Sequence, residues 1–393
     1  MTDDPLLRYR AEFPTLGDSV HLIAHSLGAM PRRARALTLQ FLDEWERHSI
    51  EAWHHWLPRV EDTGNAIARI LGVAPGTVAI QQNVSTAQAI VASCLQFAPP
   101  RNRVVYSSMN FHTVHYVWQE SVRRGAEVIV VPSEDGIHPP MEALLGAIDE
   151  RTLIVPISHV LFRSSAVKDV RAIVKRARDV GALVLLDCYQ SAGTLPLALA
   201  EWDVDMACGG SVKWACGGPG CAYLYVRPDL AARLEPMNTG WFAHKRPFAF
   251  EMDRVDYADA PAWRMANGTP PIPALFSARA GWDLLAEVGV ERIREKSLRQ
   301  TRALRELLEQ RGFVINTPRD DVQRAGTICF DFDGAQPVAI ELNRRRFFCD
   351  YRPKAGIRAS PHYYTTDAEI EAFVREIDAI RRVGVPNPAA AAY

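Results

Sequence analysis

The chain alternates two kinds of segment through its middle, and this alternation limits the fold more than any other feature. Short runs rich in Val and Ile recur, and several are apolar at every position; they lie at 104–106, 128–131, 153–157, 183–186 and 222–226. Such runs are typical of strands buried on both faces of a parallel sheet. Helical stretches lie between them, most clearly at 167–180. We therefore expect an α/β domain with right-handed helical crossovers.

The pattern changes near residue 270. A Pro-rich segment at 267–273 cannot be helical throughout. A long helical pattern follows at 274–311, and Gly289 within it predicts two helices with a bend or short loop between them. Strands are expected at 327–332 and 347–351, and a closing helix at 367–381. We predict a large domain over 45–270 and a smaller α+β domain made of 1–44 and 271–393.

Composition argues against several classes of protein. The chain has 45 basic and 46 acidic side chains, a balance that argues against binding nucleic acid by neutralising phosphates. Apolar stretches such as 182–186 are far shorter than the roughly 20 residues that span a membrane. The acidic N-terminus does not resemble a signal peptide. Seven scattered cysteines without a CxxC pair favour neither a disulfide framework nor a metal site. A cytoplasmic location is expected.

Asp187 and Lys213 are the residues that favour a specific chemistry. Asp187 ends the apolar run 182–186, and the carboxyl end of a buried parallel strand is where such sheets bind ligands. Lys213 lies among glycine turns and beside a Trp, where desolvation lowers an ammonium pKa and frees the amine as a nucleophile. Pyridoxal 5'-phosphate (PLP) requires such a lysine for its Schiff base and an acid at its ring nitrogen. The Ser211 hydroxyl is expected to reach the cofactor phosphate. The alternative is a turn-capping Asp187 and a surface Lys213.

Four segments lie in order around these residues: DCYQSAG at 187–193, DVDM at 203–206, SVK at 211–213 and GGPG at 217–220. Together they resemble the core of the class V PLP enzymes, which include cysteine desulfurases, isopenicillin-N-epimerase-like proteins and kynureninases. The resemblance implies fold type I, with a large, mostly parallel-sheet α/β domain and a smaller α+β domain. It makes Lys213 the lysine that carries PLP, Asp187 the partner of the ring nitrogen and Gln190 a neighbour of the ring hydroxyl.

Further segments follow one branch of that superfamily over nearly the whole chain: SLG at 26–28, GWFAH at 240–244, WR at 263–264, NGTPPI at 267–272, CDYRP at 349–353 and IRASP at 357–361. They resemble signatures of the kynureninases. The resemblance implies a homodimer with shared active sites, in which Trp241 and Thr269 approach the phosphate across the interface. It places Ser26, His244 and Arg358 at the substrate. Trp241 could equally be a core residue, and His244 an exposed or core histidine.

Some candidate contacts follow from the residues themselves. The planar fork of Arg358 can hold a substrate α-carboxylate, with a structural ion pair as the alternative. Phe111 comes just after the strand at 104–106 and can stack on the pyridine ring, unless it is a plain core aromatic. Ser85 and Thr86 precede a helical run, where hydroxyls and free amides favour a phosphate. The alternative for this pair is an ordinary N-cap.

The chain departs from the kynureninase pattern around these pockets. Val212 stands where kynureninases have Tyr directly before the lysine, so this position has no hydroxyl for the phosphate or for proton transfer. Gln190 replaces a His, and 160–165 replaces a Tyr-Tyr-Thr-Gly segment. The Trp-His-His-Trp segment at 53–56 is expected to line the substrate cleft, or to lie on an amphipathic surface helix.

The leading hypothesis is a PLP-dependent hydrolase that cleaves the Cβ–Cγ bond of kynurenine or a related β-acyl amino acid and releases alanine. One alternative is another class V reaction on a small amino acid: transamination, epimerisation or β-elimination of a C–S bond. Cys349 could serve a desulfurase, but the adjacent Asp350 would raise its thiol pKa. A second alternative is a homologue that binds PLP without turnover. The expected partners are a small amino acid and a second copy of the chain, with no nucleic acid, membrane or metal.

Overall fold

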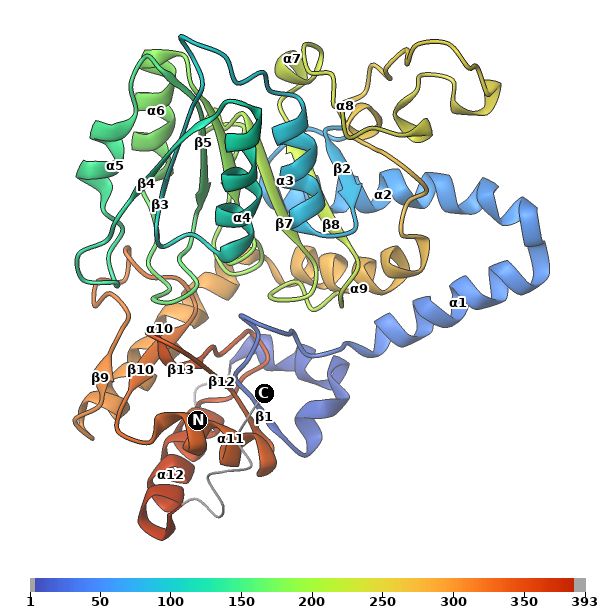
Figure 1. Ribbon diagram of the computed structural model, residues 1–393. Coiled ribbons are helices and arrows are strands. Elements are labelled where there is room, and N and C mark those ends of the chain that lie inside the picture. Colours follow the sequence, from blue (N-terminus) through green and yellow to red (C-terminus); the bar gives the residue numbers. More distant parts are fainter. Residues whose placement is uncertain (1–3, 385–393) are drawn as a thin grey trace.

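The computed structural model describes residues 4–384, and over this range its central feature is a seven-stranded sheet (Figure 1). In spatial order the strands are β2 (Val78–Gln81), β8 (Ala222–Val226), β7 (Met206–Gly210), β6 (Leu183–Asp187), β5 (Thr152–Ser158), β3 (Arg103–Ser107) and β4 (Glu127–Val131). All five apolar runs of the sequence form strands here, which confirms the expected α/β fold.

The sheet is parallel except at β8, which runs antiparallel to both β2 and β7. The run at 222–226 is therefore a correction to the expectation of parallel strands. The connection from β7 to β8 covers only 211–221, and a parallel crossover needs a dozen or more residues. The chain thus returns directly as an antiparallel neighbour.

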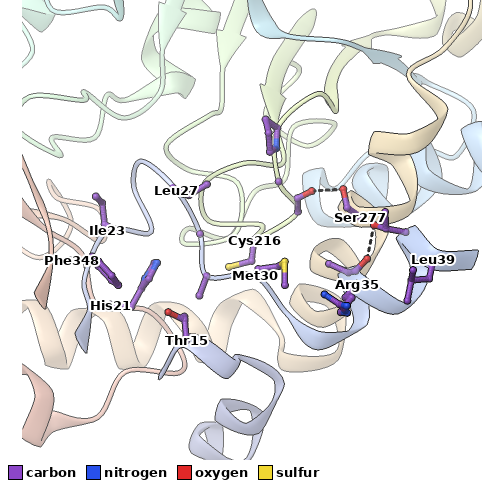
Figure 2. A pocket seen from close by; sticks show the side chains of 17 residues that line it. Thr15, His21, Ile23, Leu27, Met30, Arg35, Leu39, Cys216, Ser277 and Phe348 are labelled. Atoms are coloured by element: carbon purple, nitrogen blue, oxygen red, sulfur yellow. Dashed lines mark hydrogen bonds between the residues drawn. The ribbon is translucent and has the colours of Figure 1, made fainter. Parts of the chain in front are cut away.

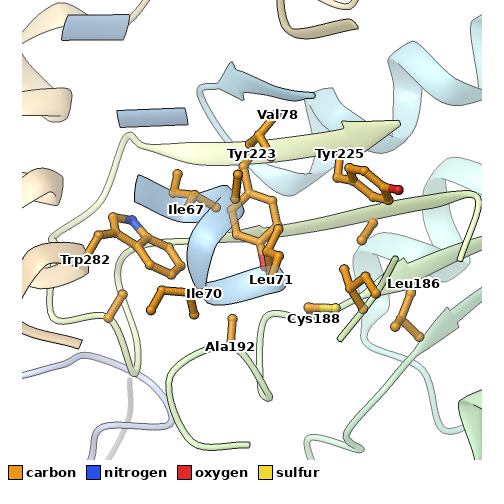
Figure 3. Close-up of a cluster of buried hydrophobic side chains, with 14 of the residues drawn as sticks. Ile67, Ile70, Leu71, Val78, Leu186, Cys188, Ala192, Tyr223, Tyr225 and Trp282 are labelled. Atoms are coloured by element: carbon orange, nitrogen blue, oxygen red, sulfur yellow. The ribbon is translucent and has the colours of Figure 1, made fainter. Parts of the chain in front are cut away.

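Helices cover both faces of the sheet because successive strand residues point to opposite faces. On one side, Val184 and Leu186 share a core cluster with α2 (Trp53–Leu71), α5 (Met141–Ala147), α6 (Val170–Val180) and α9 (Ile272–Val288). On the other side, Leu185 packs with α3 (Val84–Ser93), α4 (His112–Glu120) and α7 (Pro228–Ala231). Figure 3 shows the first cluster, in which Leu71 and Trp282 lie near Tyr223 of β8.

Helix α6 begins three residues later than the periodicity predicts. Asp169 is its N-cap, and the carboxylate accepts a hydrogen bond from the Ala172 N–H. Val167 instead forms an isolated bridge with Val160. The residues before the cap therefore belong to a loop that returns toward the end of β5.

A second, smaller assembly lies beside the main sheet (Figure 1). Its sheet order is β12 (Asp350–Arg352), β13 (Gly356–Ala359), β10 (Ile328–Asp331) and β9 (Val314–Ile315), and its helices are α10 (Val290–Glu309), α11 (Ala335–Arg344) and α12 (Asp367–Val383). The N-terminal segment joins it, because β1 (Val20–His21) pairs in parallel with β11 (Phe347–Phe348).

Two further helices pack on the main assembly. Helix α1 (Arg32–His48) packs on α9, where the Phe41 and Phe276 ring centroids are 5.5 Å apart. Helix α8 (Pro261–Arg264) lies against β2. Since α9 contributes to the core of the main sheet, we propose the two-domain division with its second boundary near Gly289 rather than at 271. No helix within residues 4–384 has the length and apolar character needed to cross a membrane.

Candidate active site

Five loops meet at one edge of the main sheet, because β2, β3, β5, β6 and β7 all run in the same direction. This is the edge at which parallel sheets bind ligands. A cavity of about 200 Å³ lies between the loops, and its lining is Asn83, Val84, Ser85, Phe111, Thr113, Ser158, Val160, Phe162, Asp187, Tyr189, Gln190 and Lys213. The fold thus gathers five of the predicted site residues around one space.

Lys213 follows β7 and extends its amine between two aromatic rings. Its Nζ lies 4.3 Å from the Tyr189 ring centroid and 5.3 Å from that of Phe111. Burial lowers the pKa of this amine to about 8, and the nearby Asp187 carboxylate only partly offsets that effect. About a tenth of the amine is therefore unprotonated, and nucleophilic, at pH 7.

Asp187 ends β6 and faces the same cavity. Its Oδ1 accepts a hydrogen bond of 2.9 Å from the Tyr189 N–H. Burial raises the pKa of the carboxyl, whereas the Tyr189 N–H and the cations of Lys213 and Lys168 lower it. The carboxylate is an acceptor that a protonated ring nitrogen can use.

Two helix N-termini converge at the cavity. Ser85 in the first turn of α3 and Thr113 in the first turn of α4 bring their hydroxyl oxygens within 3.3 Å of each other. Free N–H groups and helix dipoles favour an anion there. Thr86 has a different role, because its N–H and hydroxyl both donate to Asn83 Oδ1, at 2.9 and 3.1 Å. The N-cap of α3 is therefore Asn83 rather than Ser85 or Thr86, and Ser85 lines the cavity.

Gln190 connects the cavity to the N-terminal loop. Its Nε2 donates to the His25 carbonyl oxygen at 2.9 Å, and its Oε1 accepts from Trp214 Nε1 at 3.0 Å. The Gly28 N–H donates to the Val212 carbonyl oxygen at 2.8 Å. The loop that contains Ser26 thus lies directly against the segment that carries Lys213, although Ser26 itself stands outside the cavity lining.

Ser211 is not brought to the cavity, which corrects the expectation for its hydroxyl. The side chain is buried, and its Oγ accepts a hydrogen bond of 2.9 Å from Trp282 Nε1 on α9. The preceding residue, Gly210, lies against Tyr189, because an added Cβ there would be 2.5 Å from the Tyr189 hydroxyl oxygen. The side chain that contacts the Lys213 amine in this region is therefore that of Tyr189.

Arg358 is a buried residue of β13 and forms an ion pair with Asp350. A structural ion pair was the alternative that the sequence left open for this residue. Its Nε and Nη2 donate to the two carboxylate oxygens of Asp350 at 2.8 and 2.6 Å, and its Nη1 donates to the Phe162 carbonyl oxygen at 2.9 Å. Three of the five guanidinium N–H groups are used in this way within the described chain, which leaves two for a ligand. His25 Nε2 also contacts Asp350 Oδ1, at 3.0 Å.

Other predicted residues lie away from this cavity. Thr269 lines a separate small cavity beside Trp263. Trp241 packs on Phe242, with ring centroids 4.0 Å apart, and His244 Nδ1 accepts from the Arg246 N–H at 2.9 Å. A single chain therefore does not bring these three predicted residues to Lys213.

The segment at 53–56 also lies elsewhere, so the expectation that it lines the cleft is not met within one chain. Trp56 is buried, with its Nε1 donating to Glu44 Oε2 at 3.1 Å. His54 and His55 are exposed. The amphipathic-helix alternative describes this segment.

A larger cavity, of about 800 Å³, lies on the other side of the N-terminal loop (Figure 2). Leu27, Met30 and Leu39 line it together with Cys216 and Phe348. Its lining is mostly apolar, and Leu27, Met30 and Leu39 are also exposed. The feature is therefore an apolar cavity that reaches the surface of the chain.

Sequence reasoning did not single out three residues at the site: Tyr189, Asn110 and Lys168. Tyr189 was present within the DCYQSAG segment, two residues after Asp187, and its place near the strand end was the available signal. Asn110 immediately precedes Phe111, and its side chain bonds to the end of β5. Lys168 offered no such signal, because it lies in a helical pattern that contains several other basic residues.

Comparison with known proteins agrees with this geometry. The aminotransferase class-V family model matches residues 44–373. The chain belongs to the aminotransferase class-V family. An uncharacterized aminotransferase of Bacillus subtilis (strain 168), YcbU, is 31% identical over 95% of this chain and 97% of its own length. The kynureninase of Geobacillus thermodenitrificans is 29% identical, over 94% of this chain and 90% of that protein.

Solved structures share the fold of this class V chain. A cysteine desulfurase from Thermococcus onnurineus NA1 has a TM-score of 0.85 at 19% identity, covering 96% of this chain and 98% of that one. A C-DES mutant with glycine covalently linked to the PLP cofactor has a TM-score of 0.86 at 22% identity, covering 94% and 99%. The fold-type I architecture and the kynureninase-like resemblance expected from the sequence are confirmed.

Class V enzymes depend on PLP, so the predicted cofactor and enzyme class are confirmed at the level of the family. The residues around the cavity fit that cofactor. Lys213 offers a free amine, Asp187 an acceptor for the ring nitrogen, and Phe111 and Tyr189 two ring faces. The helix N-termini at Ser85 suit a phosphate.

Proposed function

We propose that this chain is a PLP-dependent hydrolase that cleaves the Cβ–Cγ bond of kynurenine or a related β-acyl amino acid and releases alanine. Curated kynureninases at 27–29% identity over most of the chain support this branch of the family. The structural observation that carries the proposal is the cavity whose lining combines Lys213 and Asp187 with the aromatic rings of Phe111 and Phe162.

The aromatic lining supports an aryl side chain on the substrate. The Phe162 ring centroid is 5.2 Å from that of Phe111 and 5.4 Å from that of His112. Phe111 is partly exposed. An aromatic ring that enters the cavity can pack on these edges and faces, each contact contributing about 0.5–1.5 kcal/mol beyond its area burial.

The roles of the individual residues follow from their geometry. PLP, when bound, supplies a ring that withdraws electrons from the substrate α-carbon. Lys213 Nζ is the base that takes the α-proton, because its lowered pKa leaves part of the amine unprotonated. Asp187 accepts the hydrogen bond of the protonated ring nitrogen. The two remaining N–H groups of Arg358 bind the α-carboxylate, while Asp350 fixes the guanidinium.

Proton return needs a second group, since Val212 provides no hydroxyl. Tyr189 is the candidate, because its ring contacts the Lys213 amine. Burial raises the pKa of the Tyr189 hydroxyl, so it remains protonated. Lys213 Nζ and the Tyr189 hydroxyl are thus the groups that return protons to Cα and Cβ once water has added to the γ-carbonyl and the Cβ–Cγ bond has broken.

A direct assay tests the hydrolase proposal. Purified protein loaded with PLP is incubated with kynurenine, and anthranilate is followed by fluorescence with Lys213→Ala as the control. Turnover in the wild-type chain and none in the variant supports the proposal. Bound PLP without any anthranilate would eliminate kynurenine as the substrate.

Transamination is the second candidate, favoured by the 31% identity to a Bacillus subtilis protein named as an aminotransferase. A desulfurase is disfavoured, because Cys349 is buried and burial raises the pKa of its thiol. Incubation with several amino acids plus a keto acid, followed by product analysis, separates these reactions. A new amino acid formed from the keto acid would identify a transaminase, whereas alanine formed together with anthranilate from kynurenine identifies the hydrolase.

We also propose that the chain acts as a homodimer with shared active sites. Trp241, Phe248 and Phe250 form an exposed apolar group, and Leu27 and Met30 expose a second one beside the large cavity. A second copy would cover these surfaces and bring Trp241, Thr269 and His244 toward the partner's Lys213.

The seven unpaired cysteines agree with a reducing, cytoplasmic location.

Subunit mixing tests the shared site. Lys213→Ala subunits are expected to be inactive alone, and Trp241→Ala subunits to be weakly active. Random mixing should restore roughly a quarter of wild-type activity, since half of the dimers are hybrids with one intact site each. No recovery on mixing, or a monomer by light scattering, would argue against the shared site.

A further inference from the structure

Lys168 is a buried amine with no role in the chemistry described so far. It lies just before the N-cap of α6 and is only 2% exposed. Its Nζ donates to Asn110 Oδ1 at 3.0 Å and to the Ser158 carbonyl oxygen at 3.1 Å. Its main-chain N–H donates to the His159 carbonyl oxygen at 2.9 Å. Burying a lysine is costly without such partners, so its position is a specific feature of this fold.

The partners of Lys168 form the wall of the cofactor cavity. Ser158 lines the cavity and pairs with Asp187 in the register of β5 and β6. Asn110 immediately precedes Phe111, and Asn110 Oδ1 also accepts from the Ser158 N–H at 3.1 Å. The Asn110 amide nitrogen donates to the Pro156 carbonyl oxygen at 2.9 Å. Lys168 therefore joins the loop of Phe111 to the strand beside Asp187.

Besides its hydrogen bonds, Lys168 contributes a positive charge that acts on Asp187. Asp187 has Lys213 on its cavity side and Lys168 behind the wall, and both cations favour its ionised form. Burial lowers the pKa of Lys168 to about 7, an effect that the Asp187 carboxylate opposes. His159 is the other titratable neighbour, and burial lowers its pKa to about 4, so it is neutral near pH 7. Tyr189 contributes its N–H to Asp187 Oδ1.

We propose that Lys168 is a positioning residue of the cofactor site, whose charge keeps Asp187 ionised and whose hydrogen bonds hold the Phe111 loop against the ring. An ionised Asp187 keeps the proton on the ring nitrogen, which is the form that accepts electrons. This inference rests on PLP being held by Lys213 and Asp187 as proposed above. It does not depend on which reaction the enzyme catalyses.

Three substitutions separate charge from packing at this position. Lys168→Gln keeps a hydrogen-bond donor without the charge, Lys168→Met keeps the approximate volume alone, and Lys168→Arg keeps the charge. Lys175→Gln is the matched control, because Lys175 is an exposed residue of α6 paired with Asp179. The readout is the ¹⁵N chemical shift of the ring nitrogen in bound, ¹⁵N-labelled PLP, followed against pH.

The neutral variants should move the proton from the ring nitrogen toward Asp187. We expect Lys168→Gln and Lys168→Met to lower the ratio of protonated to unprotonated ring nitrogen by about tenfold, equivalent to one pKa unit. Lys168→Arg and Lys175→Gln should match the wild type. If the neutral variants do not fold, Asn110→Asp, which sets a carboxylate against the Lys168 amine, should shift the ratio in the same direction.

Two kinds of result would contradict the role of Lys168, and they can be told apart. An unchanged ring nitrogen in Lys168→Gln with PLP bound, or in Asn110→Asp if the neutral variants do not fold, would overturn this inference and leave the proposed site intact. Wild-type protein that holds no PLP, or PLP that stays attached covalently in Lys213→Ala, would overturn the proposed site and this inference with it.

Discussion

The ring of Tyr189 lies against the amine of Lys213, with Nζ 4.3 Å from the ring centroid. Its hydroxyl fills the space that a side chain at Gly210 would require. A residue two positions after the catalytic carboxylate thus forms one wall of the site, opposite Phe111.

Removing the Tyr189 ring should weaken PLP binding more than removing its hydroxyl. Tyr189→Ala loses the aromatic face, worth about 1 kcal/mol, or roughly five- to tenfold in affinity. Tyr189→Phe keeps that face and should bind PLP as the wild type does, but it should slow turnover if the hydroxyl returns a proton. Titration of the apo-protein with PLP measures affinity. Equal affinity in the Ala and Phe variants would show that the ring does not contact the cofactor.

Substituting Gly28 by Ala should disturb the segment that carries Lys213, although the two residues lie far apart in the sequence. An added Cβ there would be 2.2 Å from the Lys213 carbonyl oxygen. Gly28→Ala is expected to destabilise the fold by about 1–3 kcal/mol and to weaken PLP binding. Gly17→Ala is the control, since its Cβ would meet nothing within 4 Å. Thermal unfolding with and without PLP measures both effects, and an identical midpoint in the two variants would refute the contact.

Capture of PLP by the apo-protein should follow the ionisation of Lys213. The unprotonated amine is the nucleophile, so the rate should fall about tenfold per pH unit below its pKa of about 8 and level off above it. Asp187→Asn should move the midpoint to lower pH, because the carboxylate favours the ammonium form. Stopped-flow absorbance measures the rate. A midpoint near that of a free lysine would contradict the buried environment.

Cys349→Ala should leave catalysis nearly unchanged. The thiol is buried on the small assembly, and burial raises its pKa, so it is not a nucleophile. Turnover of any accepted amino acid should stay within about twofold of the wild type, as expected for a residue without a chemical role. Complete loss of activity in a folded variant would revive the desulfurase alternative.

Stability should fall in mild acid because several histidines are buried in the neutral form. Burial lowers the pKa of His21, His25 and His159 to about 4. The unfolded chain therefore binds more protons between pH 6.5 and 4. Stability is full above that window and declines as pH falls through it, by up to about 1.4 kcal/mol per pH unit for each histidine.

Denaturant titration across that window measures the slope. His159→Gln should flatten it, whereas His54→Gln should not, because His54 is exposed. Equal slopes in the two variants would show that His159 takes up a proton as readily in the folded chain as in the unfolded one.

Five strands of the main sheet were predictable because buried apolar runs have a local signature, whereas β2 and β7 were not predicted. Asp187 lies at the end of a predicted strand, and Lys213, singled out by its glycine turns, follows the neighbouring strand β7. Ser211 and Arg358 show where that reasoning stops. The Trp282 indole that bonds Ser211 and the Asp350 carboxylate that pairs with Arg358 are tertiary partners, so residue type alone could not reveal which way either side chain faces. Lys168 depends on packing in the same way.

The first strand of the chain pairs with β11, and the loop after it bonds to Val212 and Gln190. The segment at 20–28 is therefore held between a strand far along the chain and the loop that carries Lys213. During biosynthesis this side of the PLP pocket can be completed only after residues 347–348 have left the ribosome.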